Sequence, residues 1–273
     1  NRRNLTSYLD GYLLDKIQNG PDRPVVLHRD DWELELYYEP HIDLTNGNHR
    51  TPDYVFIFKK NNVPKGMAIL DAKYRNYVSQ GKQKWKEDVV ETAIDKYAKM
   101  QPTDEKWQVP LLASGILHSD MVFSENAEEE YHPYHVMYNE ELFATTLTEE
   151  EPHKYASIYM TPSSTYVFKN WFRLIMEYHL NEYKVCWNCG ETEVEERQLL
   201  TQYGYPKFYY TCTSCGEFWV KVHCQSKRHK IIKHMNNYHL QIKNQERWWV
   251  ICPSCGDGRP PSTEELVEDS FTF

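Results

Sequence analysis

Hydrophobic and polar positions alternate with two different periods along the first 180 residues, which predicts a chain of mixed strands and helices. Residues 32–37 (Trp-Glu-Leu-Glu-Leu-Tyr) alternate apolar and polar side chains, the pattern of a half-buried strand. Further apolar runs bounded by polar residues indicate other strands. The predicted strands are residues 32–37, 54–58, 66–73, 109–117 and a run that ends near Met160.

Other segments carry apolar side chains every three to four residues, which predicts amphipathic helices. They are residues 5–18, residues 84–100, and a segment that follows the capping residues 161–164 and reaches about Leu180. The apolar stripe of residues 84–100 consists of Trp85, Val89, Val90, Ala93, Tyr97 and Met100. The resulting order of helix, three strands, helix, two strands and helix defines an α/β fold class.

All seven cysteines lie after residue 185, and this shift in composition predicts a domain boundary. We expect a first domain at residues 1–182, a zinc-binding domain at 183–260 and an acidic tail at 261–273. A hydrophobic content of 40% is sufficient for packed cores, and a net charge of −9 excludes a protein coated evenly with lysine. No apolar run is long enough to cross a bilayer, so no membrane association is expected.

Six of the cysteines form three Cys-x2-Cys-Gly knuckles, and the seventh, Cys224, stands apart. The odd number, the paired spacing and the lack of a secretion-signal pattern favour metal thiolates over a disulfide framework. We therefore expect a reducing, cytoplasmic location.

The strongest candidate for chemistry is Thr51-Pro52-Asp53, followed eighteen positions after the aspartate by Asp71-Ala72-Lys73. Because side chains alternate faces along a strand, Asp71 and Lys73 point to the same side. A hairpin that pairs Asp53 with Asp71 has its midpoint at residue 62, within the turn-prone Asn61-Asn62. The pattern predicts two aspartates opposite each other, with Lys73 two residues beyond and both Asp71 and Lys73 exposed at the strand end.

Two converging carboxylates and a lysine suit the hydrolysis of a phosphodiester. Hard cations such as Mg²⁺ prefer carboxylate and water oxygens, so Asp53 and Asp71 are expected to bind the ion. A bound ion of this kind polarises a phosphoryl oxygen and lowers the pKa of a bound water. Lys73 is expected to orient that water and to stabilise charge in the transition state. The alternative interpretation is structural, with a turn at Pro52-Asp53 and a strand-end aspartate beside a lysine.

The segments Thr-Pro-Asp-Tyr-Val-Phe-Ile-Phe and Ala-Ile-Leu-Asp-Ala-Lys-Tyr-Arg resemble the PD-(D/E)xK nuclease superfamily. The closest likeness is to the branch that contains the nuclease subunit of the McrBC restriction system, in which a tyrosine such as Tyr97 follows on a helix. The resemblance implies a restriction-endonuclease-like mixed sheet flanked by helices. Many members carry a glutamate on a helix before the first strand. Here the candidates for a further acid are Asp10 and Asp15 on the first helix, or Glu33, Glu35 and Glu39.

This resemblance also implies a function. It predicts a Mg²⁺-dependent DNA endonuclease in a restriction or anti-phage defence system, partnered by a motor domain or subunit driven by nucleoside triphosphates. The alternative from another class is an inactive nuclease-like module with a zinc ribbon, which binds nucleic acid or scaffolds a partner.

Four cysteines in two knuckles predict a structural zinc site near the C-terminus: Cys186, Cys189, Cys212 and Cys215. The residues between the knuckles predict a hairpin, with arms at 193–201 and 208–210. The arrangement resembles the zinc ribbons of transcript-cleavage elongation factors. Those factors carry an acidic pair at the hairpin tip, which residues 202–207 lack, so transcript cleavage is not supported.

The third knuckle, Cys252 and Cys255, needs partners for a second zinc ion. His234 and His239 have a spacing that helical ligands use, and this pairing is the favoured one. Cys224 with His229 is the main rival. A further alternative joins Cys212 and Cys215 to His229 and His234 as a finger, with the outer knuckles paired. The structural alternative is that the histidines lie on the surface and bind no metal.

Basic residues accompany these histidines on what the pattern predicts to be a helix. They are Lys221, Lys227, Arg228, Lys230 and Lys233. A basic helix held by zinc is suited to follow a phosphate backbone, and a solvated helical face is the alternative.

Overall fold

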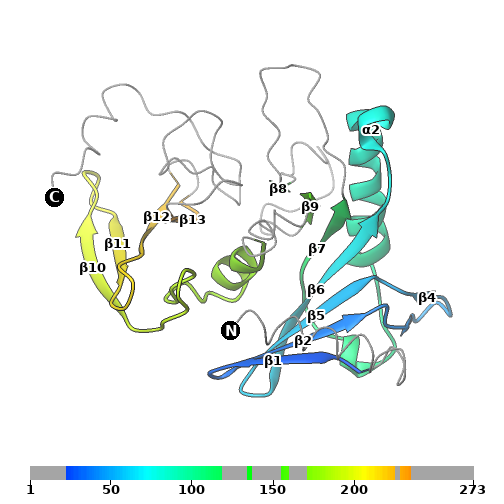
Figure 1. Ribbon diagram of the computed structural model, residues 1–273, viewed down its shortest axis with the longest axis horizontal. Coiled ribbons are helices and arrows are strands. Elements are labelled where there is room, and N and C mark those ends of the chain that lie inside the picture. The colour runs from blue at the N-terminus through cyan, green and yellow to red at the C-terminus, as the bar shows by residue number, and fades with distance from the viewer. Residues whose placement is uncertain (1–22, 119–133, 137–154, 160–170, 225–227, 235–273) are drawn as a thin grey trace. The chain divides into compact units, whose positions relative to one another are not determined.

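The computed structural model describes residues 23–118, 134–136, 155–159, 171–224 and 228–234 (Figure 1). Two compact units divide the chain. The described residues of the first include 23–118 and 155–159, and those of the second include 171–224 and 228–234. The predicted helix at 5–18 and the acidic tail at 261–273 lie outside the described residues.

The first unit is built on a mixed sheet with the strand order β1-β2-β5-β6-β7-β9. Its strands are β1 (Val25–Arg29), β2 (Trp32–Tyr38), β5 (Tyr54–Lys60), β6 (Val63–Lys73), β7 (Leu111–His118) and β9 (Tyr155–Tyr159). The short strand β8 (Tyr134–Val136) belongs to the second unit. From β1 to β6 the neighbours are antiparallel, whereas β6, β7 and β9 are parallel. The short strands β3 (Ile42–Asp43) and β4 (His49–Arg50) form a separate pair. All five predicted strands are confirmed, with small shifts at their ends.

Helices connect β6 to β7, as parallel neighbours require a crossover. The α-helix α2 (Tyr77–Val89) is interrupted at Gly81, and a π-helix, η1 (Val90–Ala98), continues it. A short 3₁₀-helix, η2 (Glu105–Trp107), precedes β7. Figure 1 shows α2 beside β7, and η1 contacts both β6 and β7. The predicted helix at 84–100 therefore exists, but its second half has the wider π turn, which the apolar spacing did not reveal.

The sheet packs its central strands against η1. Buried side chains from both strands of the β5–β6 hairpin share a core with this helix, because they alternate toward the same face. The members of this core are Tyr37, Ile42, Leu44, Val55, Ile57, Met67, Ile69, Tyr97 and Trp107. Asp53 lies two residues before Val55, and Asp71 lies two residues after Ile69, so each aspartate is on the same face of its strand as a core residue. The alternation of the strands therefore places both aspartates at the edge of this core.

The second unit contains a four-stranded antiparallel sheet, which consists of β10 (Val194–Leu200), β11 (Pro206–Cys212), β12 (Phe218–His223) and β13 (Lys230–His234). The predicted hairpin is confirmed by the pairing of β10 with β11. A helix over residues 171–179, whose last turn is the π-helix η3 (Ile175–His179), contacts this sheet. Glu177 and Tyr178 on this helix bond to His234 and Ile232 of β13.

Residues 230–234 form a strand, so the helix predicted there is wrong. The segment reads Lys-Ile-Ile-Lys-His, and its β-branched pair favours a strand over a helix. Lys221 on β12 and Lys230 and Lys233 on β13 therefore lie on a sheet, not on a basic helix.

Candidate active site

The β5–β6 hairpin sets the positions of the two aspartates. Tyr54 pairs with Leu70, and continuing this register by one residue places Asp53 beside Asp71. The predicted register is therefore correct next to the site. The backbone N–H of Ala72 donates to Asp53 Oδ2 at 2.5 Å, which confirms the close approach of the two strands at this end.

The register depends on a bulge that the sequence pattern does not predict. The turn consists of Asn61 and Asn62, both with positive φ, as a two-residue hairpin loop requires. If the register set by its closing pair, Lys60 with Val63, continued without a break, Asp53 would pair with Leu70 and not with Asp71. The register shifts between Phe58 and Lys59, because the partner strand contains one extra residue there. Without this bulge, every later side chain of β6 would face the other side of the sheet.

Asp71 lies at the centre of a network of cationic and phenolic donors. The ammonium of Lys73 is 2.7 Å from Asp71 Oδ1, and that of Lys96 is 2.9 Å from Oδ2. The Tyr97 hydroxyl also donates to Oδ2. Asp71 is only 6% exposed, so the expectation of an exposed carboxylate was wrong, because η1 covers it. Lys73 is half-buried.

The two aspartates differ in their electrostatic balance. Burial raises the pKa of Asp71, but hydrogen bonds from Lys73, Tyr97 and Lys96 outweigh it and hold the pKa below its ordinary value. For Asp53, burial is the largest effect and raises the pKa; the Ala72 N–H opposes it, while the charges of Asp71 and Glu39 add to it. Burial of the Asp53 carboxylate is therefore not fully compensated by the Ala72 N–H and the charge of Lys73, and a bound cation would stabilise its charged form.

Glu39 is the additional acid that the structure brings near this pair. It follows β2, its backbone N–H donates to the Asp53 carbonyl at 2.9 Å, and its charge raises the pKa of Asp53. Glu33 and Glu35 both bind Lys59 instead, at 3.0 and 2.5 Å. Asp10 and Asp15 lie outside the described residues. Among the candidates for a further acid that are described, Glu39 is the one whose charge acts on the site.

Lys96 and Tyr97 reach the same carboxylate oxygen from consecutive positions on η1. Tyr97 belongs to the apolar stripe of the predicted helix, and the family resemblance already singled it out. Lys96 has no such signal, because a lysine on an amphipathic helix normally faces solvent. The wider turn of a π-helix changes which side chains share a face, and π-helical turns recur at functional sites. The amphipathic pattern therefore gave no reason to place Lys96 at the site.

A second polar network follows Lys73. Asp88 is buried and accepts from the Tyr77 hydroxyl at 2.8 Å. Arg75 and Lys84 bind the same carboxylate at 2.9 and 3.1 Å. Asp88 thereby fixes two cationic side chains just beyond the strand that carries Asp71 and Lys73.

The donor set at Asp53 and Asp71 fits a hard divalent cation. Both carboxylates lie at one end of the hairpin, and an ion bound at Asp71 Oδ2 would take the place of the Lys96 ammonium. Mg²⁺ is commonly held by one or two carboxylates and keeps several waters. Asp53 and Asp71 are the residues that would hold such an ion.

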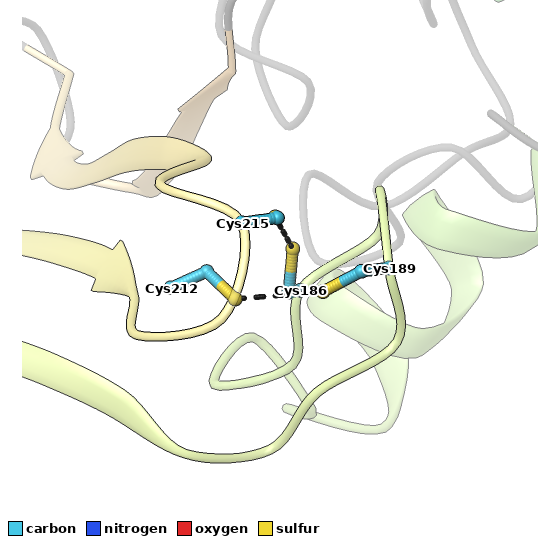
Figure 2. Close-up of side chains that lie close together, drawn as sticks. All are labelled: Cys186, Cys189, Cys212 and Cys215. Atoms are coloured by element: carbon cyan, nitrogen blue, oxygen red, sulfur yellow. Dashed lines mark hydrogen bonds between the residues drawn. The ribbon is translucent and has the colours of Figure 1, made fainter.

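The second unit brings four cysteines together, as predicted (Figure 2). Their sulfur atoms all lie within 4.8 Å of one another, and the Cys186–Cys215 and Cys189–Cys212 separations are both 3.5 Å. Hydrogen bonds, first of all that from the backbone N–H of Glu217, lower the pKa of Cys215 to about 7, whereas burial and the neighbouring thiols raise the pKa values of Cys186 and Cys189. None of the described cysteines forms a disulfide. The cluster has the chemistry of a small zinc-binding module, and it excludes the alternative that pairs the outer knuckles.

The remaining predicted zinc ligands are only partly described. His239, Cys252 and Cys255 lie outside the described residues. His234 is 3% exposed, its Nε2 lies 2.6 Å from Glu177 Oε1, and its ring stacks on Trp219. A second zinc site therefore stays a prediction.

Comparison with known families supports the interpretation of the first unit. Residues 7–104 match the model of the PD-(D/E)XK nuclease superfamily, and this segment contains Asp53, Asp71, Lys73 and Tyr97. The mixed sheet with its crossover helix is a restriction-endonuclease-like fold. No curated protein and no solved structure matches the chain. Among the described helices, none is long and apolar enough to cross a membrane.

Proposed function

We propose that the first unit is a metal-dependent nuclease that hydrolyses the phosphodiester bonds of DNA at Asp53, Asp71 and Lys73. The observation that carries this proposal is the hairpin register, which brings both spaced motifs to one end of the sheet. The match of residues 7–104 to a nuclease superfamily supports it.

Each residue has a distinct role in this proposal. Asp53 and Asp71 hold Mg²⁺, which polarises a phosphoryl oxygen and acidifies a water when it is bound. Lys73 orients the attacking water and places positive charge where the transition state gains negative charge. Tyr97 holds Asp71 in position; burial raises the pKa of its hydroxyl, and Asp71 adds to the effect, so it remains a donor.

An inactive nuclease-like scaffold is the competing proposal. Both aspartates and the lysine are present, and Asp71 and Lys73 are in contact. Donors around a buried carboxylate also occur in structural ion-pair networks. The enzyme is favoured because both aspartates and Lys73 lie at one end of the hairpin and the segment that carries them matches a nuclease superfamily.

From the resemblance to the McrBC branch we further propose a role in restriction or anti-phage defence, a cytoplasmic location and a partner motor driven by nucleoside triphosphates. The four-cysteine cluster would hold a structural Zn²⁺, because four thiolates complete a closed tetrahedral site. Such a site binds metal as the module folds.

Cleavage of labelled DNA and RNA duplexes and single strands in Mg²⁺ tests the proposal. Lys73→Met is expected to slow cleavage by about 10²–10³-fold, as for the loss of a group that stabilises the transition state. Asp71→Asn should abolish it. Lys99→Met is the matched control, because Lys99 is exposed at the C-cap of η1 and binds Asp95 instead of the site. If the parent chain cuts no nucleic acid, or if Lys73→Met cuts as fast as Lys99→Met, the proposed active site is wrong.

A further inference from the structure

Three side chains from the loop after β6 and from α2 converge on one buried carboxylate. Asp88 is 2% exposed, and its Oδ2 accepts from the Tyr77 hydroxyl at 2.8 Å. Arg75 Nε lies 2.9 Å from the same oxygen, and Lys84 Nζ lies 3.1 Å from Oδ1. Asp88 thereby ties the residues after β6 to α2 and restricts both cationic side chains. A cation that is already held in place loses less conformational entropy when it binds a ligand.

The tight cluster around Asp88 carries one negative and two positive charges. An ion pair is complete with a single cation, so one positive charge is in excess. Lys84 also lies 3.6 Å from Glu87, but this carboxylate is 53% exposed and solvent screens the pair. The hydrogen bond to Asp88 raises the pKa of Lys84, so its ammonium stays charged at neutral pH. Arg75 is 45% exposed, and a guanidinium has five N–H donors, more than one carboxylate accepts. Charge and donors therefore remain for an anion from solution.

The residue before Arg75 is an exposed aromatic side chain. Tyr74 is 92% exposed, more than any other large hydrophobic side chain in the described part of the chain. It stands between Arg75 and Lys73, which contacts Asp71. Aromatic rings next to cationic side chains are the platforms on which proteins stack the bases of single strands, because every base has a π-face. The segment after β6 thus offers a ring and a cation directly beside the proposed catalytic lysine.

The spacing along this segment fits the spacing along a nucleic-acid strand. Two residues of extended chain span at most about 7 Å, which limits the distance between the backbones of Lys73 and Arg75. A strand of duplex DNA advances about 3.4 Å per nucleotide along the helix axis. A strand whose scissile phosphate lies at Lys73 therefore brings a phosphate one or two nucleotides away within reach of the Arg75 guanidinium.

We propose that Tyr74, Arg75 and Lys84 form a strand-holding surface beside the proposed active site. Arg75 and Lys84 bind a backbone phosphate of the nucleic acid, and Tyr74 stacks on an unpaired base next to it. Asp88 is the positioning residue of this surface. Contacts to phosphate and to the face of a base hold the strand without reading its sequence. The inference rests on the proposed nuclease function, because it takes the metal site at the end of the hairpin as the place of cleavage.

Binding in EDTA tests the proposal without any cleavage step. The probes are a fluorescein-labelled oligonucleotide of mixed sequence and the duplex that it forms, and fluorescence anisotropy is measured at several salt concentrations. Arg75→Gln and Lys84→Gln should each reduce the slope of log affinity against log salt, by about 0.7 for the single strand and 0.9 for the duplex. This is the change expected for one lost phosphate contact. Lys84→Gln provides the answer even if Arg75→Gln fails to fold.

Tyr74 should give a different result because its side chain carries no charge. Tyr74→Ala should weaken binding of the single strand by about 5- to 150-fold, the effect of losing one stacked base, and should leave the salt slope unchanged. The duplex should lose less affinity, since its bases are paired and stacked on one another. Tyr74→Phe should retain the affinity of the parent, because the ring and not the hydroxyl makes the contact.

Arg29→Gln and Lys99→Gln are the matched controls. Arg29 is 50% exposed, lies 3.8 Å from Asp30 and belongs to β1, three strands away from β6 in the sheet. Lys99 forms an ion pair with Asp95 across four positions, as Lys84 does with its aspartate. Each control removes one positive charge from an ion pair and should keep the salt slope of the parent.

The outcomes separate this inference from the proposed function. The strand-holding surface is wrong if the parent binds neither probe, if Arg75→Gln and Arg29→Gln have equal slopes, or if Tyr74→Ala binds the single strand as tightly as the parent. Cleavage by the parent in Mg²⁺ would still support the nuclease in the last two cases. Conversely, a parent that gives the expected slopes but cuts neither DNA nor RNA would remove the proposed function and leave the surface as a nucleic-acid-binding site.

Discussion

Asp53 and Ala72 are joined by a 2.5 Å hydrogen bond from the Ala72 amide to the Asp53 carboxylate. This bond ties the start of β5 to the end of β6 and so holds Asp53 next to Asp71. The two carboxylates nevertheless differ: the pKa of Asp53 is raised, chiefly by burial, whereas donors from three residues lower that of Asp71. The charged form of Asp53 is disfavoured by burial, whereas that of Asp71 is stabilised by hydrogen bonds from Lys73, Tyr97 and Lys96.

The opposite shifts predict opposite effects of neutral substitutions on the stability of the metal-free protein. A raised folded-state pKa means that ionised Asp53 opposes folding once the pH rises above the ordinary carboxyl pKa. Asp53→Asn should therefore raise the melting temperature in EDTA at neutral pH, and the gain should vanish at acidic pH. Divalent ions should stabilise the parent more than this variant.

Asp71→Asn should lower the melting temperature of the metal-free protein at neutral pH. A lowered folded-state pKa gives stability that is present above the ordinary carboxyl pKa and is lost as the pH falls through the folded value. At neutral pH the substitution leaves Lys73 and Lys96 without their acceptor charge, at a cost of roughly 1–3 kcal/mol. Thermal unfolding from pH 3 to 8 measures both variants. Destabilisation by Asp53→Asn at neutral pH would contradict the assigned charge balance.

The sequence predicted most of the strands and the register of the site because these follow from local alternation. Asp53, Asp71 and Lys73 were identified because strand periodicity fixes which side chains share a face. The bulge was not predicted, since the turn at Asn61-Asn62 and the pairing of Asp53 with Asp71 seemed to agree without it. The turn is centred between Asn61 and Asn62, half a residue before the midpoint of Asp53 and Asp71. One extra residue on β6 makes up this difference, so the turn and the pairing are compatible.

Other features depend on tertiary packing and could not be predicted from periodicity. The π turn of η1 brings Lys96 to Asp71, although its spacing suggests a solvated position. The strand at residues 230–234 was misassigned because the spacing of the histidines drew attention to a helical metal site. Pairing with β12 and burial of Ile231 and Ile232 decided the conformation instead.

Gly66 should be sensitive to substitution because it lies at the bulge. A Cβ atom at this residue would lie 2.5 Å from Leu112 Cγ and 2.7 Å from the Pro110 carbonyl oxygen. The backbone oxygen cannot move away without disturbing the start of β7, where the Met67 amide bonds to it. Gly66→Ala should destabilise the protein by about 1–3 kcal/mol, as overpacking does, and should reduce cleavage. Denaturant unfolding measures the loss, with the exposed neighbour Lys65→Ala as the control. Equal stability of the two variants would show that the hairpin tolerates a shift there.

Ca²⁺ should support DNA binding without cleavage. Its larger and looser coordination sphere can occupy a site with two carboxylates but does not activate water in the geometry that Mg²⁺ imposes. Gel-shift assays in Ca²⁺ and single-turnover cleavage in each ion test this. Equal cleavage rates in the two ions would exclude the proposed mechanism of two carboxylates and a lysine.

Lys96 should compete with the divalent ion for Asp71. Its ammonium lies 2.9 Å from Asp71 Oδ2, so an ion that binds this oxygen must displace it. Lys96→Met removes the competitor and should tighten Mn²⁺ or Ca²⁺ binding severalfold, because a partly exposed ion pair contributes up to about 1 kcal/mol. Isothermal titration of the ion into the protein without DNA measures this effect and does not depend on catalysis.

The control for Lys96→Met is Lys99→Met at the C-cap of the same helix. Lys99 binds Asp95 at 2.5 Å, so its loss should leave the ion affinity unchanged although it also removes one positive charge close to η1. A similar gain in both variants would indicate a general change in the field around the site and not competition at one oxygen. Weaker ion binding in Lys96→Met alone would show that Lys96 organises Asp71 for the ion. The prediction that the ion displaces Lys96 would then be wrong, but Asp71 could still be a ligand of the ion.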